Sequence, residues 1–105
     1  MSKVANALAA TQLKFAHFGW ETAPSGDYGV YGEEQYNAFH AEGGYVLEQA
    51  ERGFVDYFTR LDDNSAKTTI ETELNKVEGI VWNLNTIQYE EDTGYIHYEW
   101  IYEAL

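Results

Sequence analysis

The chain has 105 residues, of which 45% are apolar and 16% aromatic, so a single domain can bury a sizeable core without disulfides or metal. Its formal net charge is −12, and such a surface repels nucleic acid and anionic membranes, which excludes a basic DNA- or RNA-binding footprint. Cysteine is absent, so a disulfide framework, a thiolate metal site and a cysteine nucleophile are excluded as well.

The sequence shows no stretch that is long and apolar enough to span a membrane, and no basic segment precedes an apolar run. We therefore expect a soluble, unexported protein. The negative charge has three possible interpretations: it serves solubility alone, it lines a passage through which DNA slides without sticking, or it imitates DNA and occupies a basic groove.

The first predicted element is a helix that begins after Ser2, a good N-cap residue, and ends at Gly19. Alanines supply helix propensity along it. Its larger apolar side chains fall roughly on one face: Val4, Leu8, Phe15 and Phe18.

A turn over residues 24–27 leads into a short predicted strand, "DYGVY". Gly29 and Gly32 weaken this strand or mark a place where another backbone comes close. The next segment, "EEQYNAFHAEGG", is ambiguous, and we expect a loop or short helix over the sheet. Small domains often make their contacts with loops of this length.

Aromatic and β-branched residues predict a strand at the end of "YVLEQAERGFVDYFTR". The upstream half extends this strand or forms a turn of helix, and Gly53 is a plausible bulge. Alternation places these residues on one side of the strand: Phe54, Asp56, Phe58 and Arg60. The other side carries Val55, Tyr57 and Thr59.

The second predicted helix is capped by Asn64 or Ser65 and ends near Gly79. A narrow apolar stripe runs along it: Ile70, Leu74 and Val77.

The final 25 or so residues predict a β-hairpin around the loop "EEDTG", whose Gly94 suits a loop of three to five residues. One face of its second strand carries Ile96, Tyr98, Trp100 and Tyr102. We expect one face of this hairpin to lie on the helices. The whole chain is then one α+β domain, residues 1–105, with two helices packed on one face of a four-stranded, mainly antiparallel sheet.

Signatures of catalysis are weak. His17, His40 and His97 lie on three different elements, and no phosphate-binding loop, dinucleotide fingerprint or nucleophile elbow is present. Glu33-Glu34 and Glu90-Glu91-Asp92 are paired acids, but both groups lie in predicted loops where water is plentiful, whereas acid–base catalysis needs burial of the carboxyl group. We therefore expect no enzyme, no catalytic residue, no cofactor and no metal site.

The nine tyrosines, with the phenylalanines and tryptophans, exceed what a core of this size is expected to hold. Exposed aromatic residues that cluster in a patch are typical of protein–protein contacts. The alternative is that the open face of a sheet carries tyrosine for its β-propensity alone.

The order of these elements resembles the tail-completion or tail-terminator proteins of siphophages, small tail components of Firmicutes phages. The resemblance rests on "APSGDYGVY" as the first strand, "GFVDYFTR" as the second, a capped helix, and the closing hairpin "IQYEEDTGYIHYEWIYE". It covers nearly the whole chain, except that the segment 33–52 has no clear counterpart.

The resemblance implies a non-enzymatic structural subunit of the virion tail, assembled in the host cytoplasm. Such subunits form a ring, commonly a hexamer, that contacts the tail tube and the head–tail connector proteins and lets DNA pass without binding it. No membrane contact is implied. A small acidic inhibitor that imitates DNA against a host defence nuclease is the alternative function.

Two sets of residues are assigned roles in this ring as hypotheses. The expected self-interface lies on the closing hairpin, at Tyr95, Tyr98, Trp100 and Tyr102. The acids expected at the channel or rim are Glu90, Glu91 and Asp92.

Overall fold

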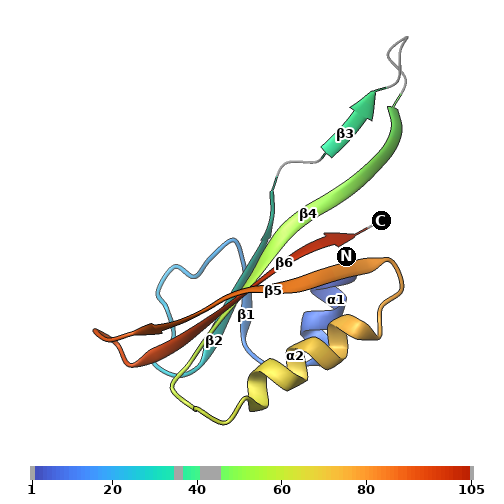
Figure 1. Ribbon diagram of the computed structural model, residues 1–105. Helices are drawn as coiled ribbons and strands as arrows, with labels where there is room; N and C mark the ends of the chain where they lie inside the picture. Colours follow the sequence, from blue (N-terminus) through green and yellow to red (C-terminus); the bar gives the residue numbers. More distant parts are fainter. Residues whose placement is uncertain (1, 35–36, 41–45, 105) are drawn as a thin grey trace.

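The computed structural model describes residues 2–34, 37–40 and 46–104 (Figure 1). Within these residues the chain forms two helices, α1 (Lys3–Ala10) and α2 (Ser65–Asn75). The strands are β1 (Phe15–His17), β2 (Tyr28–Glu33), β3 (Asn37–His40), β4 (Val46–Thr59), β5 (Ile80–Glu90) and β6 (Tyr95–Ala104). Neither helix of this part of the chain is long and apolar enough to cross a membrane.

The main sheet has the strand order β1-β2-β4-β6-β5, and β3 pairs with the first part of β4. The β1–β2 pair is parallel and the other pairs are antiparallel. Both helices lie on the same face of the sheet (Figure 1). The predicted α+β class is therefore confirmed. The four predicted strands correspond to β2, β4, β5 and β6, and the structure adds β1 and β3, which were not predicted.

The predicted first helix is too long. Ser2 caps it as expected, since its side chain accepts a hydrogen bond from Ala5 N. The helix nevertheless ends at Ala10, because the Thr11 hydroxyl donates to the carbonyl of the preceding turn and Gln12 adopts a left-handed φ of 62°. The chain then turns back toward the sheet instead of continuing to Gly19.

Residues 15–17 form β1 because they pair in parallel with β2, whose glycine leaves room for an aromatic ring. Phe15 is the register partner of Gly29, and its ring occupies the space that a side chain at Gly29 would need. The close approach expected at this glycine therefore exists, but an aromatic ring makes it, not a backbone. Phe18, expected on the helix face, follows β1 and is 64% exposed.

The β4 strand is unbroken over fourteen residues. Gly53 pairs with Glu33 of β2 and with Tyr102 of β6 without any shift of register, so the predicted bulge at Gly53 is wrong. The expected alternation is confirmed, since Val55, Tyr57 and Thr59 are buried.

The prediction of a loop or short helix over residues 33–44 is wrong at residues 37–40, which form the strand β3. The four residues of β3 pair antiparallel with the first part of β4, and this two-stranded ribbon extends beyond the rest of the sheet (Figure 1). Residues 33 and 34 continue from β2, and the rest of that prediction lies outside the described residues. The β4 backbone, which continues past the end of the main sheet, supplies the hydrogen-bonding edge that makes β3 a strand.

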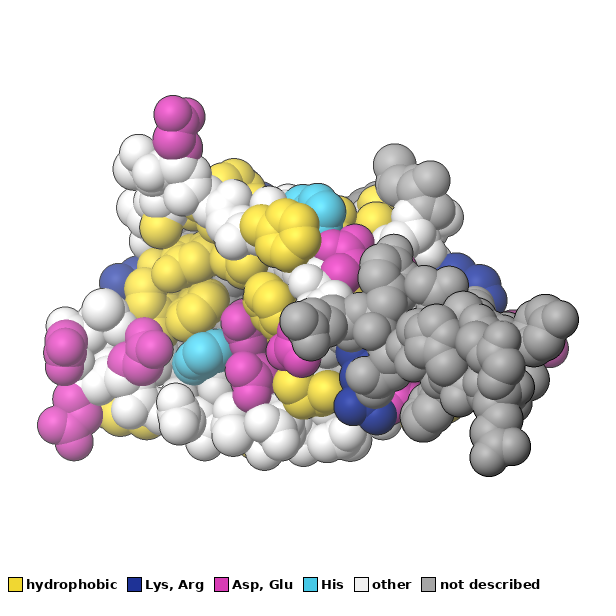
Figure 2. All heavy atoms as spheres, turned by 90° about the horizontal axis from the view of Figure 1, so that it is seen from above, with side chains coloured by type: hydrophobic (Ala, Val, Ile, Leu, Met, Phe, Trp, Pro, Cys, Tyr) yellow, Lys and Arg dark blue, Asp and Glu magenta, His cyan; other side chains and the backbone are white. Residues whose placement is uncertain are grey.

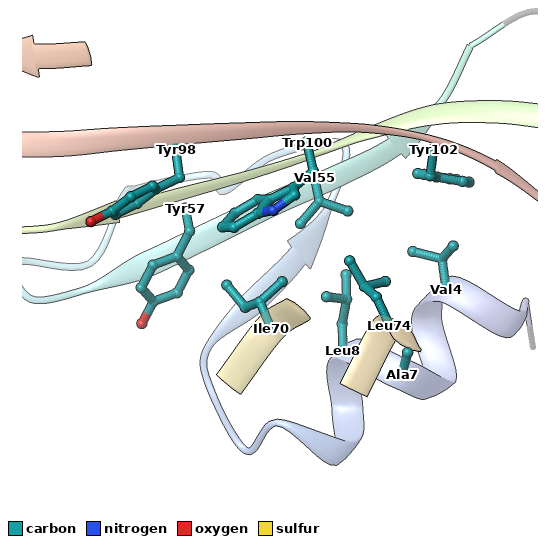
Figure 3. Packing of buried hydrophobic residues seen from close by; sticks show 10 residues of the cluster. All are labelled: Val4, Ala7, Leu8, Val55, Tyr57, Ile70, Leu74, Tyr98, Trp100 and Tyr102. Carbon is teal, nitrogen blue, oxygen red and sulfur yellow. The ribbon is translucent and has the colours of Figure 1, made fainter. Parts of the chain in front are cut away.

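The core lies between the helix-facing side of the sheet and the two helices (Figure 3). Strands β4 and β6 contribute Val55, Tyr57, Tyr98, Trp100 and Tyr102. The helices contribute Val4, Ala7, Leu8, Ile70 and Leu74. The apolar stripe predicted for α2 is thus confirmed at two of its three positions, and Val77 is partly buried against the same core.

Candidate self-association surfaces

The four aromatic residues expected at a self-interface lie inside the chain. Tyr95, Tyr98, Trp100 and Tyr102 are 6%, 2%, 0% and 1% exposed. The prediction that these residues contact another copy is therefore wrong. Three of them point from β6 toward the helices (Figure 3), and they fill the gap between the sheet and α1 and α2.

Polar partners hold these buried rings in place. Trp100 Nε1 donates to Glu71 Oε2 of α2 at 3.0 Å, and Tyr102 Oη donates to Glu51 Oε1 at 3.0 Å. Tyr95 lies on the opposite face, where its hydroxyl donates to the Gly26 carbonyl at 2.9 Å. Trp100, Tyr102 and Tyr95 thus each keep a partner for their polar atom, which offsets the cost of burying it.

The sheet face away from the helices carries a stacked row of rings across three strands. Tyr28 stacks on Phe58 with ring centroids 4.8 Å apart, and Phe58 stacks on His97 at 4.2 Å. Figure 2 views this face from above and shows hydrophobic side chains gathered on it, interrupted by acidic side chains. This face is therefore partly apolar, although both helices lie on the opposite face.

His97 lies among three carboxylates. Its Nε2 atom is 3.2 Å from Asp56 Oδ1, and its Nδ1 atom is 3.7 Å from Glu90 Oε2. Asp56 Oδ1 and His97 Nε2 are close, but they are not aligned as a hydrogen bond requires. Neither of these two atoms has another hydrogen-bond partner in the described part of the chain. The Asp56 carboxylate raises the pKa of His97, burial opposes this, and Glu90 and Glu99 add to the rise.

A raised pKa makes His97 a source of pH-dependent stability. Because the folded state binds the proton more tightly than the unfolded state, this contribution is present below the ordinary value of 6.5 and is lost as the pH rises through the folded-state pKa. We expect wild-type protein to lose more stability than His97→Gln between about pH 5 and about pH 9 in chemical denaturation. Parallel stability curves for the two proteins would contradict this assignment.

The acids expected at a channel or rim belong to a larger group at one end of the sheet. The β5–β6 turn carries Glu90, Glu91 and Asp92, of which the last two are exposed. The end of β4 lies beside this turn, since Thr59 pairs with Ile96 and donates to Asp27 Oδ2 at 2.8 Å. We call the following residues the acidic end: Asp27, Asp62, Asp63, Glu90, Glu91 and Asp92.

Arg60 is the cation closest in sequence to the end of β4, and backbone carbonyls hold it. Its Nε donates to the Thr93 carbonyl at 3.0 Å and its Nη1 to the Ser25 carbonyl at 3.2 Å. The guanidinium also lies 4.0 Å from the centre of the Tyr95 ring. Arg60 contributes one positive charge beside the six carboxylates of the acidic end, so this end keeps a net negative charge. Its role at a channel stays a prediction.

Exposed apolar side chains lie on β5, at one edge of the sheet. Ile87 and Tyr89 are 55% and 66% exposed. Both share the helix-facing side of the sheet, since Ile87 pairs with Tyr98 and Tyr89 with Ile96. The Tyr98 hydroxyl donates to Oδ1 of Asn64, the N-cap residue of α2, at 3.3 Å. Because α2 begins at this level, the rows of β5 and β6 beyond Tyr98 have no helix over them. We call Ile87 and Tyr89 the β5 surface.

A hollow lies at the other edge, between α1, the linker after it and the β1–β2 pair. Its volume is about 230 Å³. The following residues line it: Ala5, Leu8, Ala9, Leu13, Phe15 and Tyr31. We call it the α1–β1 hollow, and its lining is largely aliphatic and aromatic.

A scan against protein-family models and a search of curated proteins gave no match for this chain. In the described part of the chain, no group of three or more histidine, aspartate or glutamate side chains is arranged to hold a metal ion. Among the described residues, the β5 surface, the α1–β1 hollow and the acidic end are candidate functional surfaces. No pattern in the sequence distinguished Ile87, Tyr89 or the residues of the hollow in advance.

Proposed function

We propose that the protein is a phage structural subunit, a tail terminator or tail-completion protein that forms a ring at the head-proximal end of the tail tube. The observation that supports this most is the presence of two different apolar surfaces at opposite edges of one sheet. A ring is a head-to-tail assembly, so each subunit must present two unlike, complementary patches. The β5 surface and the α1–β1 hollow meet this requirement, whereas a twofold dimer needs only one patch.

The charge supports the same function. A ring through which DNA passes must not bind phosphates, since each cationic contact holds the DNA back. The net charge is −12, and six of the eighteen acids gather at the acidic end. We propose that this end faces the channel or its rim, where it repels the passing polyanion.

The ribbon formed by β3 and the first part of β4 gives the subunit a further contact surface. An isolated two-stranded ribbon is marginally stable in water, so it gains stability when another protein packs on it. We propose that this ribbon meets the tail tube or the head–tail connector proteins. The expected ring is a hexamer.

Native mass spectrometry of the purified chain, followed by electron microscopy of the chain mixed with siphophage tails, tests the proposal. We expect one closed oligomer, in solution or on the tube, located at a single end of each tail. A chain that stays monomeric in solution and leaves both tail ends bare would contradict it.

The acidic inhibitor is the second candidate, and the net charge is the observation that favours it. An inhibitor that imitates DNA binds a basic nuclease through charge, so its affinity falls steeply with added salt. Contacts between apolar side chains depend on salt much less. Titration of the chain against a basic nuclease at two salt concentrations separates the two functions.

A further inference from the structure

We infer that one copy joins the next by inserting Tyr89 of its β5 surface into the α1–β1 hollow of its neighbour. The inference rests on the proposed ring and names its contact. The hollow is on the β1 side of the sheet and Tyr89 is on the β5 side, and β1 and β5 are the two ends of the strand order. A contact between them therefore runs head to tail.

The register of the strands aligns the two surfaces. One cross-strand row on the helix-facing side contains, in order, Phe15, Gly29, Tyr57, Tyr98 and Ile87. Its first member lines the hollow and its last belongs to the β5 surface. A second copy placed beside the first along this row brings Ile87 and Tyr89 to the mouth of the hollow. The row spans four interstrand spacings, or about 19 Å.

The hollow has the size and chemistry to receive an aromatic ring. An apolar cavity of about 150 Å³ binds benzene, and the α1–β1 hollow has about 230 Å³. The ring of Tyr89 is 66% exposed in the single chain and can be buried against Leu8, Leu13 and the other lining residues. Tyrosine suits this position because its ring is apolar and its hydroxyl can stay at the wet rim.

Charge complementarity supports a second copy as the occupant. Lys14 lies in the chain between two lining residues of the hollow, is exposed, and has no carboxylate partner among the described residues. Tyr89 is followed by Glu90, Glu91 and Asp92. Insertion of Tyr89 brings these acids toward Lys14, so attraction adds to the apolar contact and disfavours the reverse orientation.

Side-chain insertion fits this edge better than continuous strand pairing. The register of β5 against β6 shifts between Leu84 and Thr86, which is a β-bulge in an edge strand. Such bulges disrupt the pairing of an exposed edge with another strand. Single side chains of the β5 surface remain available for contact.

Two variants test the contact by complementation. Tyr89→Ser removes the inserted ring and keeps the hollow, whereas Ala9→Phe fills the hollow and keeps the ring. Both positions are exposed, so both variants should fold. In analytical ultracentrifugation we expect each variant alone to stay monomeric at concentrations where the wild type assembles. An equimolar mixture should stop at a one-to-one dimer, because only one intact contact can form.

Matched changes control for loss of apolar surface and for helix propensity. Val81→Ser removes a 72% exposed side chain from the same strand, but on the other face. Ala10→Phe adds the same ring to the neighbouring position of α1, which does not line the hollow. Both controls should assemble like the wild type. Lys14→Glu should weaken assembly, and added salt should shrink that difference.

Oxidative cross-linking gives an independent result. The chain has no cysteine, so Tyr89→Cys combined with Ala9→Cys should give a ladder of covalent oligomers, and neither change alone should give one. Dimers from Tyr89→Cys alone would indicate a twofold contact and overturn the inference. An oligomer that survives both Tyr89→Ser and Ala9→Phe would overturn the inference and leave the ring standing. A wild-type chain that stays monomeric in solution and leaves tails bare would remove both.

Discussion

Trp100→Ala should lower the free energy of unfolding by about 3–5 kcal/mol, the usual cost of removing a large aromatic side chain from a core. Trp100 is completely buried and lies at the centre of the cluster between sheet and helices (Figure 3). Its loss also removes the hydrogen bond to Glu71 and the stacking contact with Tyr98, whose ring centroid is 5.8 Å away. Because domains of this size have a total stability of about 5–15 kcal/mol, the variant should be close to unfolding.

Denaturation in urea measures this change, and Tyr89→Ala is its matched control. Tyr89 is an exposed aromatic residue of the neighbouring strand, so its replacement should change stability by no more than about 0.5 kcal/mol. Equal, small effects of the two substitutions would mean that Trp100 lies on the surface. The original hypothesis, in which Trp100 belongs to a self-interface, would then be restored.

Gly53→Ala should destabilise the chain by about 1–3 kcal/mol or more, as overpacking of a core does. Gly53 is buried in the middle of β4, and a Cβ atom there would run into the Gly32 carbonyl oxygen and the phenol end of Tyr102. Neither can yield easily. The first is backbone of the paired strand β2, and the second is a buried ring whose hydroxyl is bonded to Glu51.

Gly26→Ala controls for the general effect of replacing glycine. A Cβ atom at Gly26 meets nothing within 4 Å and the backbone there is not left-handed, so stability should stay the same or rise slightly through the unfolded state. Melting temperatures of the two variants measure the difference. A Gly53→Ala variant as stable as Gly26→Ala would contradict the close approach of β2, β4 and β6 at this position.

Local sequence signals predicted the central elements of this fold. The alternation of Val55, Tyr57 and Thr59 and the spacing of Ile70 and Leu74 identified the buried sides of β4 and α2, because both patterns face the core. The expected end of the second helix near Gly79 was too late, since α2 ends at Asn75. The same signals do not reveal β1. Phe15 continues a helical pattern in sequence, and its place in a strand depends on the space at Gly29, which only the tertiary structure provides.

The self-association surfaces escaped prediction for two physical reasons. Strict alternation along β5 puts Ile87 and Tyr89 on the same side as Val81, but the bulge after Leu84 reverses the alternation and turns them toward the helix side. The aromatic residues of the whole chain were expected to exceed the capacity of the core, and those of β6 were therefore expected at an interface. The buried hydroxyl groups and the indole nitrogen of β6 each have a hydrogen-bond partner, so these residues can lie in the core. The hairpin turn that carries Glu91 and Asp92 was predicted correctly and is exposed, and the role of these acids at a channel stays a prediction.

Electron cryo-microscopy of siphophage tails reconstituted with the full chain is the most direct measurement. We expect a closed ring of copies at the head-proximal end of the tube, with Tyr89 of each copy in the α1–β1 hollow of the next and the acidic end toward the central passage. A tube end without added density, or copies related by twofold contacts, would contradict it.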